Sequence, residues 1–234
     1  NGNPTTGITR TYTTVTEFTD NDDVKYSSKG GHDAWDTRRY LNIWVCNLKD
    51  YLGYAQFPMY PGTVPPYSQE TDGVVILYSV FGNTGVQEYP GHFDMGRTTT
   101  HEVGHWLALR HIWGDKNDCS GTDYVDDTPP CSGPYFSGSN GICDKPIQCG
   151  YPRQTENYMD YSDDRCMNLF TQGQAARMRA AILEARQELI YRNVYVVVDQ
   201  RLNDQTSVDS IGVWESSRFT SYSVPKTFIF TTQK

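Results

Sequence analysis

The pattern of apolar and polar positions predicts a sheet followed by two helices. Residues 8–19 alternate threonine with larger apolar and aromatic side chains, which predicts a strand. Apolar runs at 40–46 and Gly73–Tyr78 predict buried strands. The shorter run Leu52–Phe57 ends at a proline, which favours an edge strand. The connecting segments are polar or rich in glycine and proline, so we expect loops there.

A helical pattern begins near Thr98, a candidate N-cap residue, and continues through Val103, Leu107 and Leu109. Residues 113–170 predict a long irregular stretch, which a compact domain tolerates when it is functional or cross-linked. A second helix is predicted after it, because a capping-box pattern precedes apolar residues spaced by three and four. These residues are Thr171 and Gln174, then Ala175, Met178, Ile182, Ala185 and Leu189.

The last part of the chain changes character. Three short apolar runs there predict strands at Tyr195–Val198, Ile211–Trp214 and Thr227–Phe230. We therefore predict a main domain over 1–190 and a β-rich extension over 191–234, either packed on the main domain or beginning a second module. The sequence starts with Asn1 rather than methionine, which we interpret as a processed or trimmed fragment. No apolar run approaches the roughly 20 residues of a membrane-spanning helix.

Composition and charge narrow the class of protein. Hydrophobic residues make up 37% of the 234 residues and charged residues 21%, which is typical of a chain that folds around a core. The net charge of -8 argues against a nucleic-acid partner, since phosphate binding needs a basic surface. The acidity is compatible with cation binding and a mild preference for basic substrates, or it serves solubility alone.

The cysteines crowd into one region. Five of the six lie between residues 119 and 166, in a stretch rich in Gly, Pro, Ser and Asp, which predicts disulfide cross-links and an oxidising compartment. A second, structural zinc site is an alternative, which the absence of CxxC spacing disfavours. Cys46 ends an apolar run and is predicted to be a buried free thiol.

The run HEVGHWLALRH, residues 101–111, predicts a metal site. On a helix, His101 and His105 lie on one face and can point at a common ion, and imidazole nitrogen suits Zn²⁺. Glu102 is then placed to act as the general base on a zinc-activated water. His32 and His92 have no such context, and we expect surface or hydrogen-bonding roles for them.

His111 imposes a condition on this interpretation. A continuous helix would turn His111 away from the other two histidines, because ten steps of about 100° separate it from His101. The metzincin pattern HExxHxxGxxH has a glycine at the turn that brings the third histidine back, whereas this sequence has Ala108. We therefore predict a sharp turn at Ala108, with His111 as the third zinc ligand.

Several separated motifs carry a family resemblance. HEVGHWLALRHIWGD, YVDDTPP, NYMDYSDD and CMNLFTQGQ occur in this order, and the chain resembles the pappalysin family of metzincins over about residues 4–190. The resemblance implies an α+β fold: a metzincin-type zinc protease domain with a twisted mixed β-sheet, an active-site helix, a Met-turn and a C-terminal helix. The family's domain begins with more chain before Asn1, which implies that this fragment lacks a first strand or that maturation removed it.

The resemblance assigns three further residues. It implies that Met159 is the base of the Met-turn, an apolar floor beneath the ligands. Tyr161 matches the family's tyrosine that stabilises the tetrahedral intermediate, a task that suits a phenol; the alternative is a core tyrosine. Asp164 matches the acid at the bottom of the S1′ pocket and would select Arg or Lys after the cut bond; the alternative is a solvated acid in a charged loop.

The same resemblance implies cross-links, ions and a substrate-binding edge. The disulfides would be Cys119–Cys149 and Cys143–Cys166, with Cys131 unpaired or joined to Cys46. Calcium sites belong to the family, and an oxygen-rich cluster suited to Ca²⁺ is formed by Asp123, Asp126, Asp127 and Thr128. Substrate would lie antiparallel to the edge strand containing Gly53, Tyr54 and Ala55.

These inferences together predict a secreted, monomeric zinc endopeptidase that acts on proteins or peptides and cuts before Arg or Lys. Two alternatives remain at this point. One is an astacin-like metzincin with a different pocket. The other is a zinc- and calcium-stabilised binding module whose catalysis has lapsed. Intact Glu102 and Tyr161 argue against this alternative. The motif also offers three protein ligands, whereas structural zinc sites usually have four.

Overall fold

The structure is a computed structural model that describes residues 7–59, 68–82, 92–138 and 142–190. Contacts divide the chain into two units, Asn1–Ile190 and Tyr191–Lys234. The second unit, with the strands predicted at Tyr195–Val198, Ile211–Trp214 and Thr227–Phe230, lies outside the described residues. The division into a catalytic domain and an extension stays a prediction, as does the missing first strand.

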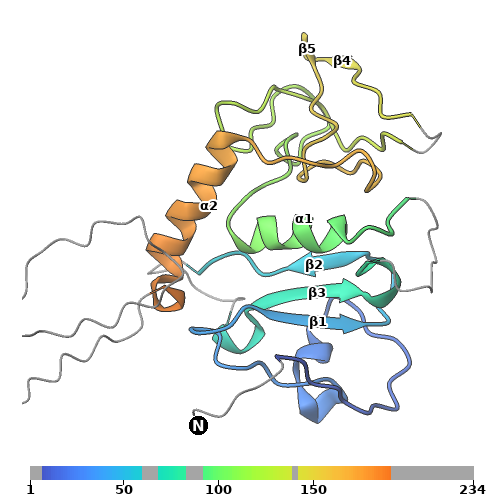
Figure 1. The fold of residues 1–234 in the computed structure, drawn as a ribbon, viewed down its shortest axis with the longest axis vertical. Helices are drawn as coiled ribbons and strands as arrows, with labels where there is room; N and C mark the ends of the chain where they lie inside the picture. Colours follow the sequence, from blue (N-terminus) through green and yellow to red (C-terminus); the bar gives the residue numbers. More distant parts are fainter. Residues whose placement is uncertain (1–6, 60–67, 83–91, 139–141, 191–234) are drawn as a thin grey trace, which may run out of the picture. The chain divides into compact units, whose positions relative to one another are not determined.

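A three-stranded mixed sheet forms the lower half of the first unit (Figure 1). Its order is β1 (Asn42–Cys46), β3 (Gly73–Leu77), β2 (Gly53–Ala55). β1 is parallel to β3, with Trp44 opposite Val75, and β2 is antiparallel to β3, with Tyr54 also opposite Val75. Every residue of β3 is buried, as its unbroken apolar run predicts. β2 has only one described neighbour, which confirms that the run around it forms an edge strand.

The helix α1 (Arg97–Trp106) lies over β2 and β3, and both the helix and the sheet contribute to the main core (Figure 1). This core contains Phe18, Val24, Trp44, Leu48, Val74, Val75, Ile76, Leu77, Val80 and Trp106. The helix starts after Gly96, whose φ of 77° stops it from extending further back. Thr98 therefore lies inside the first turn, and its prediction as the N-cap residue is wrong by two positions.

The upper half of the unit consists mostly of irregular chain, with one small hairpin formed by β4 (Ile147–Gln148) and β5 (Tyr151–Pro152) (Figure 1). Two disulfides cross-link it, Cys119–Cys149 and Cys143–Cys166, which are the pairs that the family resemblance implies. A second core cluster of Leu109, Ile112, Trp113, Cys131 and Met159 lies here. Cys46 and Cys131 are both free; Cys131 is buried, but Cys46 is only partly buried, so the prediction of a buried Cys46 is wrong.

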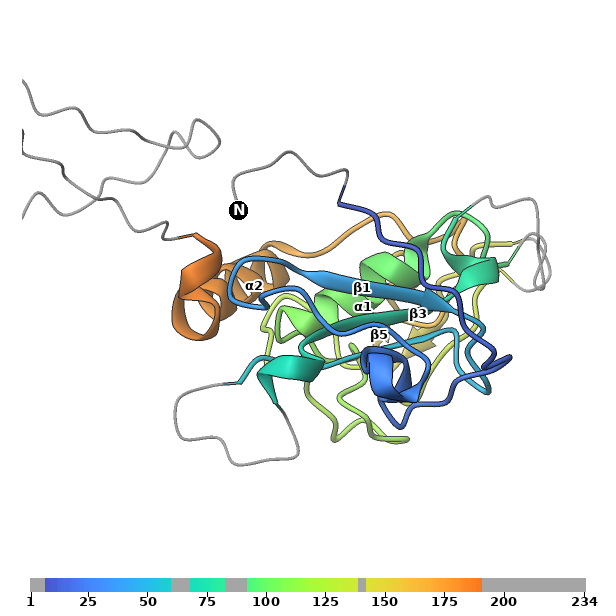
Figure 2. The same ribbon diagram turned by 90° about the horizontal axis from the view of Figure 1, so that it is seen from below.

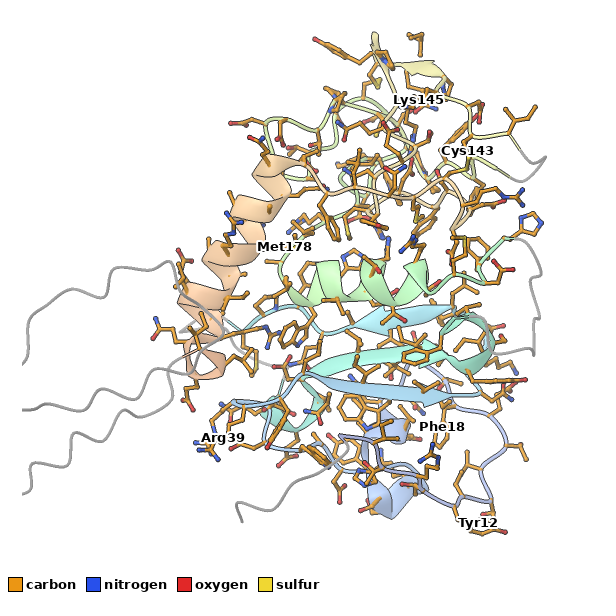
Figure 3. All side chains as sticks on the ribbon, in the orientation of Figure 1. Tyr12, Phe18, Arg39, Cys143, Lys145 and Met178 are labelled. Carbon is orange, nitrogen blue, oxygen red and sulfur yellow. A yellow bond between two sulfur atoms is a disulfide. The ribbon has the colours of Figure 1, made fainter. Side chains whose placement is uncertain are left out.

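The helix α2 (Gln172–Ala185) runs along one side of the unit, from the irregular chain toward the end of the sheet (Figures 1 and 2). It begins with the predicted capping box: Gln174 N donates to Thr171 Oγ1, and Thr171 N donates to Gln174 Oε1. Met178, labelled in Figure 3, packs against the second cluster. The predicted helical continuation to Leu189 is wrong, because Arg186 leaves helical geometry and a short 3-10 turn, Gln187–Leu189, follows.

The strand predicted for residues 8–19 does not form. In this segment the described pairing is one isolated bridge between Phe18 and Leu48. Tyr12 is 92% exposed (Figure 3), and the Thr13 hydroxyl accepts from the backbone N–H of Val15. Threonine hydroxyls offer the backbone local partners in place of a sheet ladder, so alternation alone misleads here. Short 3-10 helices occupy Asp23–Lys25, Ser27–Lys29, Gln69–Thr71 and Tyr78–Val80.

Candidate active site

Three histidines converge at one point. His101 and His105 project from α1 one turn apart, and His111 approaches from the segment that follows it. His105 Nε2 lies 3.1 Å from His101 Nε2 and 3.1 Å from His111 Nε2. A tetrahedral zinc ion with Zn–N bonds of about 2.05 Å separates its nitrogen ligands by about 3.3 Å, so these three nitrogens fit one ion. Among the described residues, this is the one group of three or more His, Cys, Asp or Glu close enough to hold a metal.

The turn that delivers His111 lies at Ala108, where the spacing predicts it. Ala108 has a φ of 72°, a left-handed conformation that costs a non-glycine residue roughly 1–2 kcal/mol. The turn is hydrogen-bonded on both sides: Ala108 N donates to His105 O, and Leu109 N donates to Gly104 O. These backbone hydrogen bonds define the turn, and the chain reverses after α1.

Each histidine has a separate acceptor at its second ring nitrogen. His101 Nδ1 lies 2.6 Å from Tyr158 O, and His105 Nδ1 lies 2.8 Å from Leu109 O. His111 Nδ1 lies 2.6 Å from Asp115 Oδ1, and its ring stacks on Trp113 with centroids 4.3 Å apart. Carbonyl and carboxylate oxygens accept only, so Nδ1 carries the proton and Nε2 presents its lone pair to the centre.

Burial keeps the imidazoles neutral, as metal ligation requires. It lowers the pKa of His105 to about 4 and takes the pKa of His101 well below its usual range, with the neighbouring rings adding to both effects. Burial also lowers the pKa of His111, partly opposed by Asp115. The donor set, its spacing and its protonation thus all fit a zinc ion.

Glu102 is buried beside the histidines, in a space that β2 leaves open. A Cβ on Gly53 would stand 2.9 Å from Glu102 Cγ and 3.2 Å from Glu102 Oε1. Burial raises the pKa of Glu102 to about 8. A carboxyl group with a pKa near neutrality is suited to accept a proton and to return it.

The floor of the site is a tight turn at Met159. Met159 is fully buried, and a Cβ on Gly104 would stand 2.5 Å from its sulfur, so the glycine of HEVGH lets α1 rest on this methionine. Met159 N donates to Asn157 Oδ1, and Asn157 exchanges two side-chain hydrogen bonds with Gln174 at the start of α2. The turn is thereby fastened to the second helix.

A buried ion pair supports the same turn. Arg153 Nε and Nη2 donate to the two carboxylate oxygens of Asp160, at 2.7 and 2.6 Å, and both side chains are inaccessible to solvent. Further donors of Arg153 reach the carbonyl oxygens of Ser132 and Gly133. This bidentate arrangement is rigid, and it holds the backbone between Met159 and Tyr161.

Tyr161 lies against the histidines. Its ring centroid is 5.0 Å from that of His111 and 5.7 Å from that of His101, and the rings of Trp113 and Phe136 flank it at 4.9 and 5.7 Å. Burial raises its pKa to about 12, so the phenol keeps its proton at neutral pH. The structure thus places the ring of a protonated phenol beside the metal-binding group.

A cavity of about 460 Å³ lies beside the three histidines, and Asp164 is one of the residues that line it. Its Oδ2 accepts from the backbone N–H groups of Met95 and Arg97, at 2.7 and 3.1 Å. Its Oδ1 is buried without a hydrogen-bond partner among the described residues. Burial raises the pKa of this carboxyl group, while the two backbone donors oppose that shift.

β2 forms one wall of this cavity. All three of its residues line the cavity, together with Asp50, Tyr51 and Leu52 before them. The predicted substrate-binding strand, the metal group, Tyr161 and Asp164 therefore border one space. The other sides are completed by Phe93, Arg97, Thr98, Phe136, Asp160 and Met167.

The residues of the predicted calcium cluster have other partners. Thr128 Oγ1 donates to both carboxylate oxygens of Asp123, and Asp127 Oδ2 accepts from Gly173 N. Asp126 is exposed. These carboxylates do not form a metal-binding group in the described part of the chain, and calcium stays a prediction.

The two isolated histidines make ordinary contacts. His92 Nδ1 lies 2.8 Å from Asp163 Oδ2, and His32 Nδ1 lies 2.7 Å from Asp33 O. Neither residue belongs to the metal-binding group.

The sequence reasoning missed several residues that hold the site. Asp115, Arg153 and Arg177 contact His111, Asp160 and the Ala108 carbonyl respectively. Only Asp115 could have been found from the sequence, because it is an acidic residue four positions after the predicted zinc ligand His111. Arg153 and Arg177 are seven and 69 residues from the groups that they contact, and only the folded chain pairs them.

Comparison with known proteins identifies the family. Residues 25–183, more than half of the chain, match the family model described as Pregnancy-associated plasma protein-A, a peptidase family. The chain belongs to this family, the pappalysins. The pappalysin assignment that the motifs support is thereby confirmed.

Solved pappalysin structures share the fold. A structure of mirolysin in complex with a compound is 52% identical, with a TM-score of 0.70, and the match covers 80% of this chain and 70% of that one. Mature mirolysin from Tannerella forsythia in complex with a cleaved peptide is 51% identical, with a TM-score of 0.65 and the same coverage. The α+β metzincin fold is therefore confirmed.

Curated relatives of this pappalysin domain include fungal proteins. An extracellular metalloprotease of Colletotrichum graminicola is 42% identical over 143 residues, which are 60% of this chain and 48% of that protein. Extracellular metalloprotease 1 of Coccidioides posadasii is 40% identical over 154 residues, or 64% and 50%. The chain spans about half the length of the curated relatives that it matches. In the described part of the chain, no helix is long and apolar enough to cross a membrane.

Proposed function

We propose that this chain is an extracellular zinc-dependent endopeptidase that cuts peptide bonds before arginine or lysine. The convergence of three Nε2 atoms next to a buried carboxylate, in a cavity walled by an edge strand, is the observation that carries the proposal. The family and its named metalloproteases support the reaction class. Two disulfides, which form and persist in oxidising compartments, support an extracellular location.

His101, His105 and His111 would hold the ion. When bound, zinc supplies Lewis acidity and lowers the pKa of a coordinated water toward 7. Glu102 takes a proton from the attacking water and passes it to the amine nitrogen of the leaving group. Its raised pKa suits both transfers, since the group must gain and lose the proton in one turnover.

Tyr161 donates its phenolic hydrogen to the oxygen that becomes negatively charged as water adds to the scissile carbonyl. The phenol remains protonated at neutral pH because burial raises its pKa. Its aromatic neighbours hold the ring in place, so the donor needs little reorganisation during the reaction.

The peptide binds along β2 as an added antiparallel strand. β2 pairs with β3 on one side only, among the described strands, and all three of its residues line the cavity. Main-chain hydrogen bonds of this kind bind peptides of many sequences. The mature mirolysin structure, solved with a cleaved peptide, supports peptide binding by this fold.

Asp164 selects the residue after the cut bond. Its buried Oδ1 has an unused acceptor position, and an unpaired buried acceptor is unfavourable. A guanidinium or ammonium group entering the cavity supplies the missing donor and a compensating charge. A neutral side chain that cannot donate leaves Oδ1 of Asp164 without a donor, so basic residues at P1′ are favoured.

A peptide-cleavage assay tests the proposal. Wild type, Glu102→Ala and Asp164→Asn are incubated with matched peptides that carry Arg, Lys, Met or Glu at P1′, with and without a zinc chelator. We expect chelator-sensitive cleavage before Arg and Lys by wild type and none by Glu102→Ala. Asp164→Asn should lose about 30-fold or more of the preference for basic residues.

The outcomes separate the parts of the proposal. Zinc-loaded wild type that cuts none of the peptides contradicts the enzymatic function and favours a binding module. Cleavage that ignores the P1′ residue, or is unchanged in Asp164→Asn, contradicts only the specificity.

A further inference from the structure

The turn at Ala108 has a partner outside the metal-binding motif. The side chain of Arg177, on α2, reaches back across 69 positions of sequence and donates from Nε to the carbonyl oxygen of Ala108, at 2.8 Å. Arg177 is half-buried. The hydrogen bond therefore links the middle of α2 directly to the residue whose positive φ reverses the chain.

A second arginine of the same segment holds the end of α1. Arg186 Nε donates to Trp106 O at 3.1 Å, its guanidinium lies 3.8 Å from the centre of the Trp106 ring, and its Nη atoms bind Asp72. Trp106 Nε1 also donates to Asp72. The carbonyls on both sides of Leu107 are thus bound by arginines, and Arg177 is the one that contacts the strained residue.

The contacts of Arg177 and Arg186 have different effects on the three zinc-binding histidines. Trp106 is the last helical residue and has ordinary helical geometry, so Arg186 anchors the helix end. Ala108 is three residues before His111, and its left-handed conformation decides whether the chain reverses. A charged donor on its carbonyl favours this peptide orientation over the alternatives open to a non-glycine residue.

We propose that Arg177 is a positioning residue for His111, which replaces the glycine of the metzincin motif by stabilising the left-handed turn at Ala108. The inference rests on the proposed zinc site. Glycine adopts positive φ without steric cost, so a chain with glycine at this position has no need of the contact. Alanine adopts positive φ only at a steric cost, and the hydrogen bond from Arg177 to the Ala108 carbonyl offsets that cost.

The test measures zinc affinity by competition with a chromophoric chelator, a readout that does not depend on activity. The variants are Arg177→Met, Ala108→Gly and the double variant; Arg179→Met, an exposed arginine of the same helix, is the matched control. We expect Arg177→Met to bind zinc about tenfold more weakly, and Arg179→Met to bind it normally. In the Ala108→Gly background, the effect of Arg177→Met should shrink to less than about threefold.

If Arg177→Met weakens zinc binding equally in the wild-type and Ala108→Gly backgrounds, the proposal is overturned, because the effect of the arginine then does not depend on the alanine at the turn. An unchanged zinc affinity in Arg177→Met overturns it as well. His111→Ala separates this inference from the proposed function: if it binds zinc as tightly as wild type, the metal site itself is wrong. If Arg177→Met does not fold, Arg177→Ala, which also lacks a side-chain donor, carries the same comparison, with circular dichroism of the zinc-free proteins as the check on folding.

Discussion

Gly53 and Glu102 share one space: a Cβ on Gly53 would lie 2.9 Å from Glu102 Cγ, closer than side-chain carbons approach. The proposed substrate-binding edge and the proposed general base are therefore fitted to each other. The same Cβ would lie 3.0 Å from Val75 O, so a side chain at Gly53 has no free direction within the sheet. Both the Glu102 side chain and the neighbouring strand therefore require a glycine at this position.

Gly53→Ala should lower kcat about tenfold or more, since a misplaced base costs much of its contribution to the rate. Zinc affinity should stay unchanged, because the three histidines do not contact this residue. Steady-state kinetics with a basic P1′ peptide, together with chelator competition, checks both expectations. A normal kcat in a folded, zinc-loaded Gly53→Ala variant contradicts the steric argument.

Gly104→Ala should destabilise the domain by about 1–3 kcal/mol through overpacking, because the new methyl group would overlap the sulfur of Met159. The free energy of unfolding in urea gives the measurement. Adding Met159→Ala supplies the control, since it removes the overlapping atoms. The added cost of Gly104→Ala should disappear in that background, and an equal cost in both backgrounds would show that the overlap is not its source.

Asp115→Asn should weaken zinc binding about 10- to 100-fold, the usual effect of losing the acceptor behind a ligating histidine. Asparagine tolerates the positive φ of 57° at this position, so the backbone should be unaffected. Asp118→Asn is the matched control, because Asp118 is exposed and hydrogen-bonds only locally to Ser120. Equal zinc affinity in the two variants contradicts a role for Asp115 in orienting His111.

The preference for basic P1′ residues should depend on pH. Burial raises the pKa of Asp164, so its carboxyl group takes up a proton at a higher pH than an exposed aspartate. The ionised form binds the cation, so the preference is complete above this pKa and is lost as the pH falls through it. The ratio of kcat/KM for Arg and Met peptides, measured from about pH 8 to about pH 4, gives the profile. Asp164→Asn should show a small ratio with no such dependence, and a flat wild-type ratio contradicts the assignment.

Several elements could be read from the sequence because their causes are local. The unbroken apolar run of β3 appears as a fully buried strand, and the pattern from Thr171 to Gln174 forms a capping box. The fold class followed from motifs in the expected order. Residues 8–19 show the opposite case. The alternation of polar and apolar residues predicts a strand there, but the segment forms one isolated bridge. A strand also needs the free edge of another strand to pair with, and no local pattern specifies where that edge lies.

By itself, the sequence determined which side chains could bind a metal, since His101 and His105 are one helical turn apart and lie on one face whatever surrounds them. The place of His111 depends on a left-handed alanine, and its support comes from Arg177, 69 residues beyond that alanine. Likewise, the room for Glu102 comes from Gly53 on another element. Local spacing specifies ligands because helix geometry is regular, whereas strain and steric fit are balanced by contacts that only the tertiary structure brings together.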